Sequence, residues 1–192
     1  MERKNLKRLK KQLLVLLKKS ALKRGRFILS SGKISNYYLD GRIITLTPEG
    51  AYLVAGIILE LIKGSKIDAI GGPTLGADPI AGALACLSHI KHIPLKIFIV
   101  RKRAKEHGMR RQIEGPVLKK GNRVVLIDDV ATTGKALIEA KQELDKIGVV
   151  IERAIVIVDR CQGAKENLAK AGLQLDSIFQ IEDLGIKNKG KR

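Results

Sequence analysis

The sequence predicts an α/β protein with a doubly wound, mostly parallel sheet and a small N-terminal region outside it. Short β-branched apolar runs alternate with longer segments whose apolar residues recur at helical spacing, and only short connections separate them. The short runs predict strands buried on both faces, and their alternation with helices favours a parallel sheet covered on both sides. Such sheets bind ligands at the carboxyl ends of their strands. The residues that follow each apolar run are therefore the candidates for a binding site.

The length of the chain predicts one domain over residues 1–192. Within it we expect an N-terminal helix followed by short strand-like pieces (1–46), a core (47–184) and a basic tail (185–192). The composition, 45% hydrophobic with a mean hydropathy near zero, is typical of an ordinary soluble globule. No uncharged apolar run is long enough to cross a membrane, so no membrane partner is expected.

The first residues of the chain and its two cysteines bear on the cellular compartment in which we expect the protein. Residues 1–24 carry too many lysines for a secretory signal. The two cysteines, Cys86 and Cys161, have neither metal-ligand spacing nor the density of a disulfide scaffold. We therefore expect a cytoplasmic protein.

The net charge of +18 raises the question of a nucleic-acid partner, because basic chains attract polyanions. Much of the excess lies near the termini, since residues 1–26 hold eleven Lys and Arg against one Glu. Aromatic residues make up only 3% of the chain, so stacking platforms for single strands are scarce. We interpret the charge as a solvated surface that also attracts phosphorylated substrates, and we expect no nucleic-acid partner.

The N-terminal region predicts a helix followed by short strand-like pieces. Leucines at helical spacing, with lysines on the other face, predict a helix over residues 4–23 that ends before Gly25. A helix on a membrane surface is the alternative, but aromatic anchors are missing. Residues 29–42 are divided into short strand-like pieces by Ser, Gly and Asn. These pieces bring together Tyr37, Tyr38, Asp40 and Arg42.

The next part of the chain predicts scaffold and a first glycine-rich turn. A helix is expected from Thr47, as its N-cap, to Gly64, with Pro at its first position. A strand over 67–70 then leads into the turn 71–79 and an apolar helix over 80–87. On the residues alone, a tight structural loop is as well supported here as a ligand-binding one.

A strand over 96–100 runs into residues 101–116, which are rich in charge and glycine and show no apolar period. Such a segment cannot bury itself, so we expect it to be mobile until anions order it. A charged solvent loop is the alternative. The last elements predicted are a strand over 151–158 that ends at Asp159-Arg160, a helix from Gly163 through Leu168 and a strand over 173–181.

The centre of the chain combines a strand, an acidic pair and a turn of small residues. Residues 124–127 predict a buried strand that delivers Asp128 and Asp129 at its carboxyl end. Residues 131–135, Ala-Thr-Thr-Gly-Lys, then turn into a helix over 136–147. Unpaired N–H groups, the positive end of the helix dipole and two threonine hydroxyls at this helix start favour a phosphate dianion.

The adjacent carboxylates require a polar ligand. They repel each other and are costly to bury, so they should face hydroxyl groups or a hydrated metal ion. A ribose 5-phosphate satisfies both the acids and the turn. An acidic surface turn is the alternative, which the combination of strand, acids, Thr-Thr-Gly and amphipathic helix disfavours. The stretch lacks GxxxxGK[ST], so a Walker-type nucleotide site is not supported.

Residues 123–137 resemble the phosphoribosyl diphosphate (PRPP) motif of the type I phosphoribosyltransferases. The resemblance implies that the two acids contact the ribose hydroxyls, with a catalytic role, and that the turn holds the 5-phosphate. The residues implied in PRPP binding by this motif are Asp128, Asp129, Val130, Ala131, Thr132, Thr133, Gly134, Lys135 and Ala136.

Residues 101–108 match the flexible catalytic loop of the orotate phosphoribosyltransferases within that family. The match implies that Arg101, Lys102, Lys105 and His107 contact PRPP. Lys105 is expected to be catalytic, neutralising charge on the leaving pyrophosphate. In the family this loop reaches into the neighbouring subunit's site, which implies a homodimer with a shared loop.

Residues 29–42 resemble the hood of the orotate enzymes, in which aromatic positions cover the pyrimidine. Residues 71–79 resemble the family's pyrophosphate loop, which often contains a cis peptide at the position of Thr74-Leu75. Ser30 and Gly76 stand where many bacterial members have lysine.

Arg160 matches the arginine that grips the orotate carboxylate, a pairing suited to a planar guanidinium, and Thr132 is expected to contact orotate as well. The resemblance therefore implies a pentosyltransferase of UMP biosynthesis that joins orotate to PRPP. Mg²⁺ is the implied cofactor, held mainly by PRPP and water without direct protein ligands.

Two other functions stay open on the sequence. A phosphoribosyltransferase for another base is disfavoured by Arg160 and the hood. A PRPP-binding, nucleic-acid-binding regulator with the same fold is favoured by the charge of +18. It is disfavoured by the lack of a helix-turn-helix segment and by the presence of Lys105 and His107.

Overall fold

The computed structural model describes residues 2–28, 34–93, 95–102 and 112–187. Its main sheet has six strands in the order β5-β4-β3-β6-β7-β8, all parallel except the edge strand β5. The strands are β3 (Ala69–Pro73), β4 (Lys96–Val100), β5 (Ile113–Glu114), β6 (Arg123–Ala131), β7 (Val150–Asp159) and β8 (Leu175–Gln180). The predicted doubly wound, mostly parallel sheet is confirmed.

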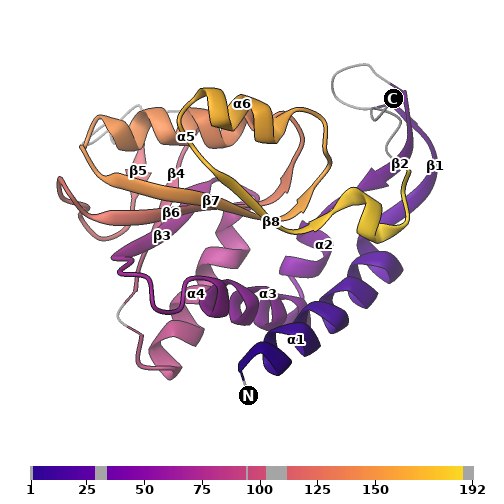
Figure 1. Cartoon of the computed structure of the whole chain (residues 1–192), viewed down its shortest axis with the longest axis horizontal. Helices are drawn as coiled ribbons and strands as arrows, with labels where there is room; N and C mark the ends of the chain where they lie inside the picture. The colour runs from indigo at the N-terminus through magenta and orange to yellow at the C-terminus, as the bar shows by residue number, and fades with distance from the viewer. Residues whose placement is uncertain (1, 29–33, 94, 103–111, 188–192) are drawn as a thin grey trace.

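Helices cover both faces of this sheet (Figure 1). One face carries α5 (Lys135–Asp145) and α6 (Ala164–Lys170), and the other carries α1 (Glu2–Leu16), α3 (Pro48–Leu61) and α4 (Ala77–Ile90). Strand β6 contributes to the hydrophobic core on each face of the sheet, because its side chains alternate between the two faces. Val124 and Leu126 pack in the core beneath α5 and α6, whereas Val125 and Ile127 pack with α3 and α4.

The hood consists of β1 (Leu22–Ile28), β2 (Ile34–Leu39) and α2 (Arg42–Thr45), and its two strands pair in antiparallel fashion. The N-terminal helix continues past α1 as a π-helical turn, η1 (Leu17–Ala21). Our prediction of a helix to residue 23 was therefore too long, because Leu22 already pairs with Leu39 of β2. Gly25 does not end a helix but lies inside β1, at the register shift that precedes Phe27.

The hood is also joined to the end of the chain. The last described element is the 3₁₀ turn η2 (Ile181–Leu184), and Arg24 Nη2 donates a hydrogen bond of 3.0 Å to the Gly185 carbonyl oxygen that follows it. Figure 1 shows the strands of the hood beside this C-terminal segment. The expected helix after Thr47 is confirmed, since the Thr47 hydroxyl accepts a hydrogen bond of 3.1 Å from the Gly50 amide.

Two strands extend further than the sequence predicted. Strand β3 continues through Gly71, Gly72 and Pro73, which were assigned to a turn, because β4 pairs with all of them. A side chain at Gly71 would collide with the Phe98 carbonyl oxygen, so the glycine is needed for this close pairing. Strand β6 likewise continues through the acidic pair to Ala131, paired with β7. Its carboxylates therefore lie on a strand rather than after one.

The remaining boundaries differ by a few residues. Helix α4 extends beyond the predicted 80–87 at both ends, whereas α5 ends before the predicted residue 147. Strand β8 begins two positions after the predicted residue 173. Within the described ranges, none of the helices is long and apolar enough to span a membrane.

Candidate active site

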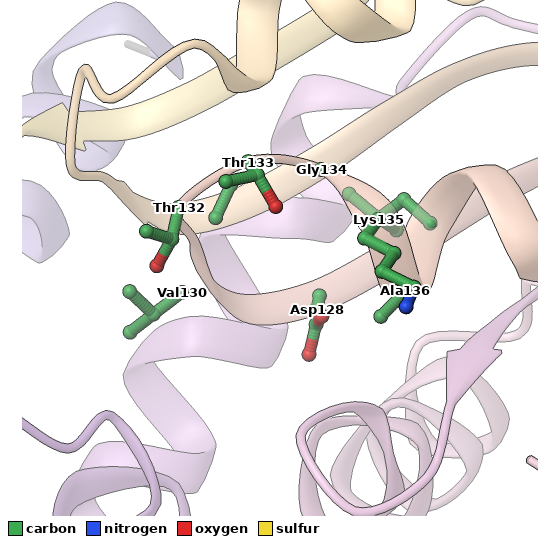
Figure 2. Close-up of a pocket in the computed structure, with 9 residues that line it drawn as sticks. Asp128, Val130, Thr132, Thr133, Gly134, Lys135 and Ala136 are labelled. Atoms are coloured by element: carbon green, nitrogen blue, oxygen red, sulfur yellow. The ribbon is translucent and has the colours of Figure 1, made fainter. Parts of the chain in front are cut away.

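The turn between β6 and α5 forms a small pocket at a helix N-terminus (Figure 2). The pocket has a volume of about 180 Å³ and is lined by Asp128 and residues 130–137. Gly134 has a φ of 78°, which a residue with a side chain rarely adopts, and no side chain caps the helix at this position. The first amides of α5 are therefore left for a ligand, and their arrangement suits a phosphate.

The turn is supported from α6, which the sequence did not reveal. Asn167 Nδ2 donates a hydrogen bond of 2.9 Å to the Thr133 carbonyl oxygen. A side chain added at Gly134 would come within 3.0 Å of Leu168, so α6 packs directly behind the turn. The turn is thus held from behind while its amides stay available on the other side.

Asp128 and Asp129 lie side by side on β6 and are enclosed by backbone. Asp128 Oδ1 accepts a hydrogen bond of 2.9 Å from the Asp129 amide, and Asp129 Oδ1 accepts one of 2.8 Å from the Val130 amide. A side chain at Gly76 would collide with Asp128 Oδ1, and one at Gly41 would come within 2.9 Å of Asp129 Oδ2. These glycines allow the hood and the 71–79 turn to close around the acids.

Burial raises the pKa of both carboxyls. The pKa of Asp128 is raised well above its ordinary value, first by desolvation and then by the charge of Asp129. Desolvation also raises the pKa of Asp129. The nearby Arg42 is committed to Asp40, to which its Nε and Nη2 donate bonds of 2.9 Å, and this pairing lowers the pKa of Asp40. Within the described residues no cation forms an ion pair with the acids, so they favour a ligand that donates hydrogen bonds.

Replacing Asp128 by Asn is expected to stabilise the ligand-free protein at neutral pH. A carboxyl whose pKa is raised by folding favours the folded state when protonated. The protonated Asp128 carboxyl therefore contributes to the free energy of unfolding at low pH. This contribution is lost as the pH rises from the ordinary pKa of 3.8 through the raised pKa of the folded state. The melting temperature of Asp128→Asn should exceed that of wild type, and the difference should grow as the pH rises above 3.8. Each kcal/mol of stabilisation should raise the melting temperature by about 2–4 °C.

Thermal denaturation followed by circular dichroism across that pH range checks this expectation. Asp145→Asn is the matched control, because Asp145 forms an exposed ion pair with Lys141 at 2.7 Å and its loss should not raise the melting temperature. If Asp128→Asn melted at a lower temperature than wild type at pH 8, burial of the Asp128 charge would not be what destabilises the ligand-free protein.

A second cleft of about 320 Å³ continues from the phosphate-sized pocket. It brings together segments that are far apart in the chain: Tyr38, Leu39, Asp40 and Arg42 of the hood, Pro73, Thr74, Leu75 and Gly76, then Lys102, Asp128, Asp129, Val130, Thr132, Ala136 and Arg160. The Thr74-Leu75 peptide is cis, as the resemblance implied. Thr74 Oγ1 donates a hydrogen bond of 2.6 Å to Asp78 Oδ2, a contact that the sequence analysis missed.

Arg160 lies at the end of β7 and contributes a buried cation to this cleft. Its amide donates a hydrogen bond of 2.9 Å to the Ala131 carbonyl oxygen, which holds it beside the turn. Its Nη2 is buried and has no hydrogen-bond partner among the described residues. Among the described residues Asp159 forms no ion pair with it, and Asp159 Oδ1 instead accepts a hydrogen bond of 2.8 Å from the Cys161 amide. The guanidinium can therefore bind an anionic ligand.

The two tyrosines of the hood are placed differently from what the sequence suggested. Tyr38 lines the cleft and is 38% exposed, so it is available to cover a ligand. Tyr37 is only 5% exposed and lies against Arg160 instead. The expectation that both aromatic positions face the ligand therefore needs correction.

The basic residues expected to bind phosphate are only partly described. Lys102 lines the cleft, and Arg101 lies next to it with its Nη1 3.4 Å from Glu114 Oε1. Lys105 and His107 lie outside the described residues. Lys135, at the start of α5, is largely exposed and pairs with Glu139 at 3.7 Å. Among the described residues, no cluster of three His, Cys, Asp or Glu side chains is arranged to hold a metal ion.

Comparisons with known proteins show which family the chain resembles over most of its length. The family model described as "Phosphoribosyl transferase domain" matches residues 43–189. The orotate phosphoribosyltransferase of Aquifex aeolicus is 45% identical over 172 residues, which are 88% of this chain and 93% of the relative. That of a Nostoc species is 43% identical over 92% of this chain and 85% of the relative.

Solved structures show the same similarity. The orotate phosphoribosyltransferase of Mycobacterium tuberculosis in complex with PRPP has a TM-score of 0.77 and 31% identity, over 93% of this chain and 99% of that one. The enzyme of Aeropyrum pernix has a TM-score of 0.72 and 33% identity, over 90% and 94%. An adenine phosphoribosyltransferase from Leishmania donovani, at 16% identity and a TM-score of 0.64, shares the fold.

Proposed function

The chain belongs to the phosphoribosyltransferase family and transfers the phosphoribosyl group of PRPP to orotate, and we propose how its residues divide this reaction. The products are orotidine 5′-monophosphate and pyrophosphate, in pyrimidine biosynthesis. One observation supports the proposal above all. The phosphate-sized pocket at the start of α5 is continuous with a cleft that holds an acidic pair on one side and a buried arginine on the other.

PRPP would lie with its 5-phosphate in the turn and its ribose over the acids. The amides and hydroxyls of residues 130–136 surround the small pocket, so they would bind the phosphate. Asp128 and Asp129 would accept hydrogen bonds from the ribose hydroxyls, which relieves the cost of their burial. Arg101, Lys102, Lys105 and His107 would contact the pyrophosphate.

Orotate would occupy the wider cleft beneath Tyr38, with its carboxylate on Arg160. Thr132 lines both pockets and would contact the base where it meets the ribose. Because uracil and purines lack the carboxylate, they would leave the Arg160 charge without a partner. This arrangement would select orotate among bases.

The chemistry needs charge stabilisation and alignment rather than a nucleophilic side chain. A ring nitrogen of orotate bonds to C1′ of PRPP as the C1′–O bond to pyrophosphate breaks, and the proton of that nitrogen is released to water. Positive charge develops on the ribose ring in the transition state. With the ribose over the acidic pair, the carboxylates would lie beneath that charge and stabilise it, while Lys105 would stabilise the growing negative charge of pyrophosphate. Ile113–Glu114 pair with β4, so the expected mobile segment does not extend over all of 101–116. Closure of the loop that carries Lys105 and His107 would exclude water from the reacting carbon.

Mg²⁺ is compatible with these residues if PRPP supplies most of its ligands. Among the described residues no three His, Cys, Asp or Glu side chains are arranged to hold a metal ion, and this fits an ion held mainly by phosphate oxygens and water. When bound, the ion would neutralise pyrophosphate charge. We also propose a cytoplasmic homodimer in which the loop that carries Lys105 and His107 in each subunit reaches the active site of the partner.

Lys105→Ala is expected to lower kcat far more than it weakens PRPP binding, by about 100-fold or more. The reason is that charge on the leaving group grows mainly toward the transition state. Steady-state kinetics give the loss in kcat, and a direct binding measurement gives the loss in PRPP affinity. A proportionate loss in both quantities would indicate that Lys105 binds the ground state instead.

Mixing Lys105→Ala with Arg160→Ala subunits tests the shared loop. If each loop serves the partner's site, a mixed dimer holds one site with both residues intact, and activity should partly recover. No recovery in dimers shown to be mixed would mean that each subunit supplies its own loop. Release of pyrophosphate with orotate, compared with uracil and adenine, tests the proposed base selection in the wild type.

A further inference from the structure

The contact between Tyr37 and Arg160 joins the hood to the end of β7. Arg160 Nε donates a hydrogen bond of 3.0 Å to the Tyr37 hydroxyl, and the guanidinium carbon lies 4.9 Å from the centre of the Tyr37 ring. The two residues are 123 positions apart in the chain, and both are buried. The hydroxyl and the ring therefore hold the guanidinium at two points, through hydrogen bonding and cation–π attraction.

This contact orients Arg160 without neutralising it. A carboxylate in place of the hydroxyl would compensate the charge and compete with an anionic ligand. Within the described residues no acid forms an ion pair with Arg160, and the adjacent Asp159 bonds to the Cys161 amide. The neutral phenol thus leaves the full positive charge available to a ligand in the cleft.

The contact also determines which edge of the guanidinium a carboxylate can use. Arginine offers a side edge, made of Nε and one terminal nitrogen, and an end edge made of both terminal nitrogens. Tyr37 occupies Nε, so the side edge cannot bind both oxygens of a carboxylate. Nη2 is buried and has no partner among the described residues. A carboxylate is therefore directed to the end of the guanidinium.

We propose that Tyr37 is a positioning residue for base selection: its hydroxyl fixes Arg160 so that the terminal nitrogens meet the carboxylate of orotate. This inference rests on the proposed binding of orotate by Arg160. It assigns different roles to the two neighbouring tyrosines, with Tyr38 in the wall of the cleft and Tyr37 behind the arginine.

Tyr37→Phe tests the hydroxyl while keeping the ring beneath the guanidinium. The KM for orotate should rise about 10- to 100-fold, as expected for losing a hydrogen bond to a charged group. The kcat and the KM for PRPP should stay within about twofold, because the turn and the acids are unchanged. Uracil has no carboxylate, so its slow reaction should be unaffected and the preference for orotate should fall by the same factor as its KM rises.

Tyr52→Phe is the matched control, since Tyr52 is exposed on α3 and lines neither pocket of the site. It should leave the KM for orotate unchanged. A Tyr37→Phe enzyme with wild-type KM for orotate, or with equal losses for orotate and uracil, would overturn the positioning role.

A double-mutant cycle separates this inference from the function on which it rests. If Tyr37 acts through Arg160, then Tyr37→Phe should have no further effect on orotate binding in an Arg160→Ala background. If Arg160→Ala itself leaves the KM for orotate unchanged, the assignment of the carboxylate to Arg160 fails. A strong effect of Arg160→Ala with none of Tyr37→Phe defeats only the positioning role.

A measurement on the wild type covers the case in which Tyr37→Phe does not fold. In the isotope-labelled protein, the Nε–H resonance of Arg160 is identified by its disappearance in Arg160→Ala. A buried hydrogen bond to Tyr37 predicts that this proton exchanges slowly with solvent, with and without orotate. Exchange as fast as that of exposed arginines would overturn the inference.

Discussion

Replacing both Asp128 and Asp129 by Asn is expected to abolish phosphoribosyl transfer while the protein stays folded. Each carboxylate would accept a hydrogen bond from a ribose hydroxyl, and bonds to charged groups are worth about 1.5–3 kcal/mol each. Losing both should lower kcat/KM by about a thousandfold or more. The fold should survive, because burial disfavours the charged form of both acids and Asn removes that cost.

Pyrophosphate release and a thermal melt of the same sample check the two parts of this expectation. The matched control is the double variant Glu143→Gln with Asp145→Asn, which removes two acids from the surface of α5. It should retain activity. Undiminished turnover in the Asp128→Asn, Asp129→Asn enzyme would mean that the acids do not face the substrate.

Arg160→Ala is expected to raise the KM for orotate about 100-fold or more while PRPP still binds. Removing one partner of a desolvated, hydrogen-bonded charge pair typically costs 2–5 kcal/mol, about 30- to several thousand-fold. The turn over residues 130–136 is untouched, so PRPP affinity measured by calorimetry should stay near that of wild type. The variant should also lose most of the preference for orotate over uracil.

Two further variants sharpen this test. Arg160→Lys keeps the charge but lacks the planar fork, so it should recover only part of the orotate affinity. Arg123→Ala removes an arginine from the opposite end of β6, where it pairs with Glu152 at 3.0 Å, and should leave the KM for orotate unchanged. If Arg160→Ala weakened PRPP binding as much as orotate binding, the arginine would act on the site as a whole.

Much of the fold could be predicted because its signals are local. The strand over 96–100 and the helix capped by Thr47 were confirmed, since apolar runs and caps act within a few residues. The predicted boundaries of helices and strands were wrong where pairing with a distant strand determines the local structure. Gly71 and Gly72 indicate a turn on their own, but β4 extends alongside them, and Leu22 leaves the helix because β2 pairs with it.

In the candidate site, too, features set by neighbouring residues could be predicted, whereas contacts between distant residues could not. The acids and the turn after them are contiguous in sequence, so the motif and its phosphate-sized pocket could be inferred together. Tyr37 could not be assigned in this way, because its partner is 123 positions away and only folding brings them within hydrogen-bonding distance. Asn167 escaped notice for the same reason, as it supports Thr133 from another helix.

The close approach of Gly76 to the acids bears on how the family's sequences should be compared. Many bacterial orotate enzymes resemble this chain but carry lysine at that position, and a simple alignment would treat the two residues as alternatives. Here any side chain at Gly76 would collide with Asp128 Oδ1, so the glycine depends on where the loop lies relative to the acids. Exchanging the residue without the rest of the loop would move the acidic pair. In this loop conformation, a lysine placed at position 76 alone would therefore displace the carboxylate of Asp128 before it could contact a ligand.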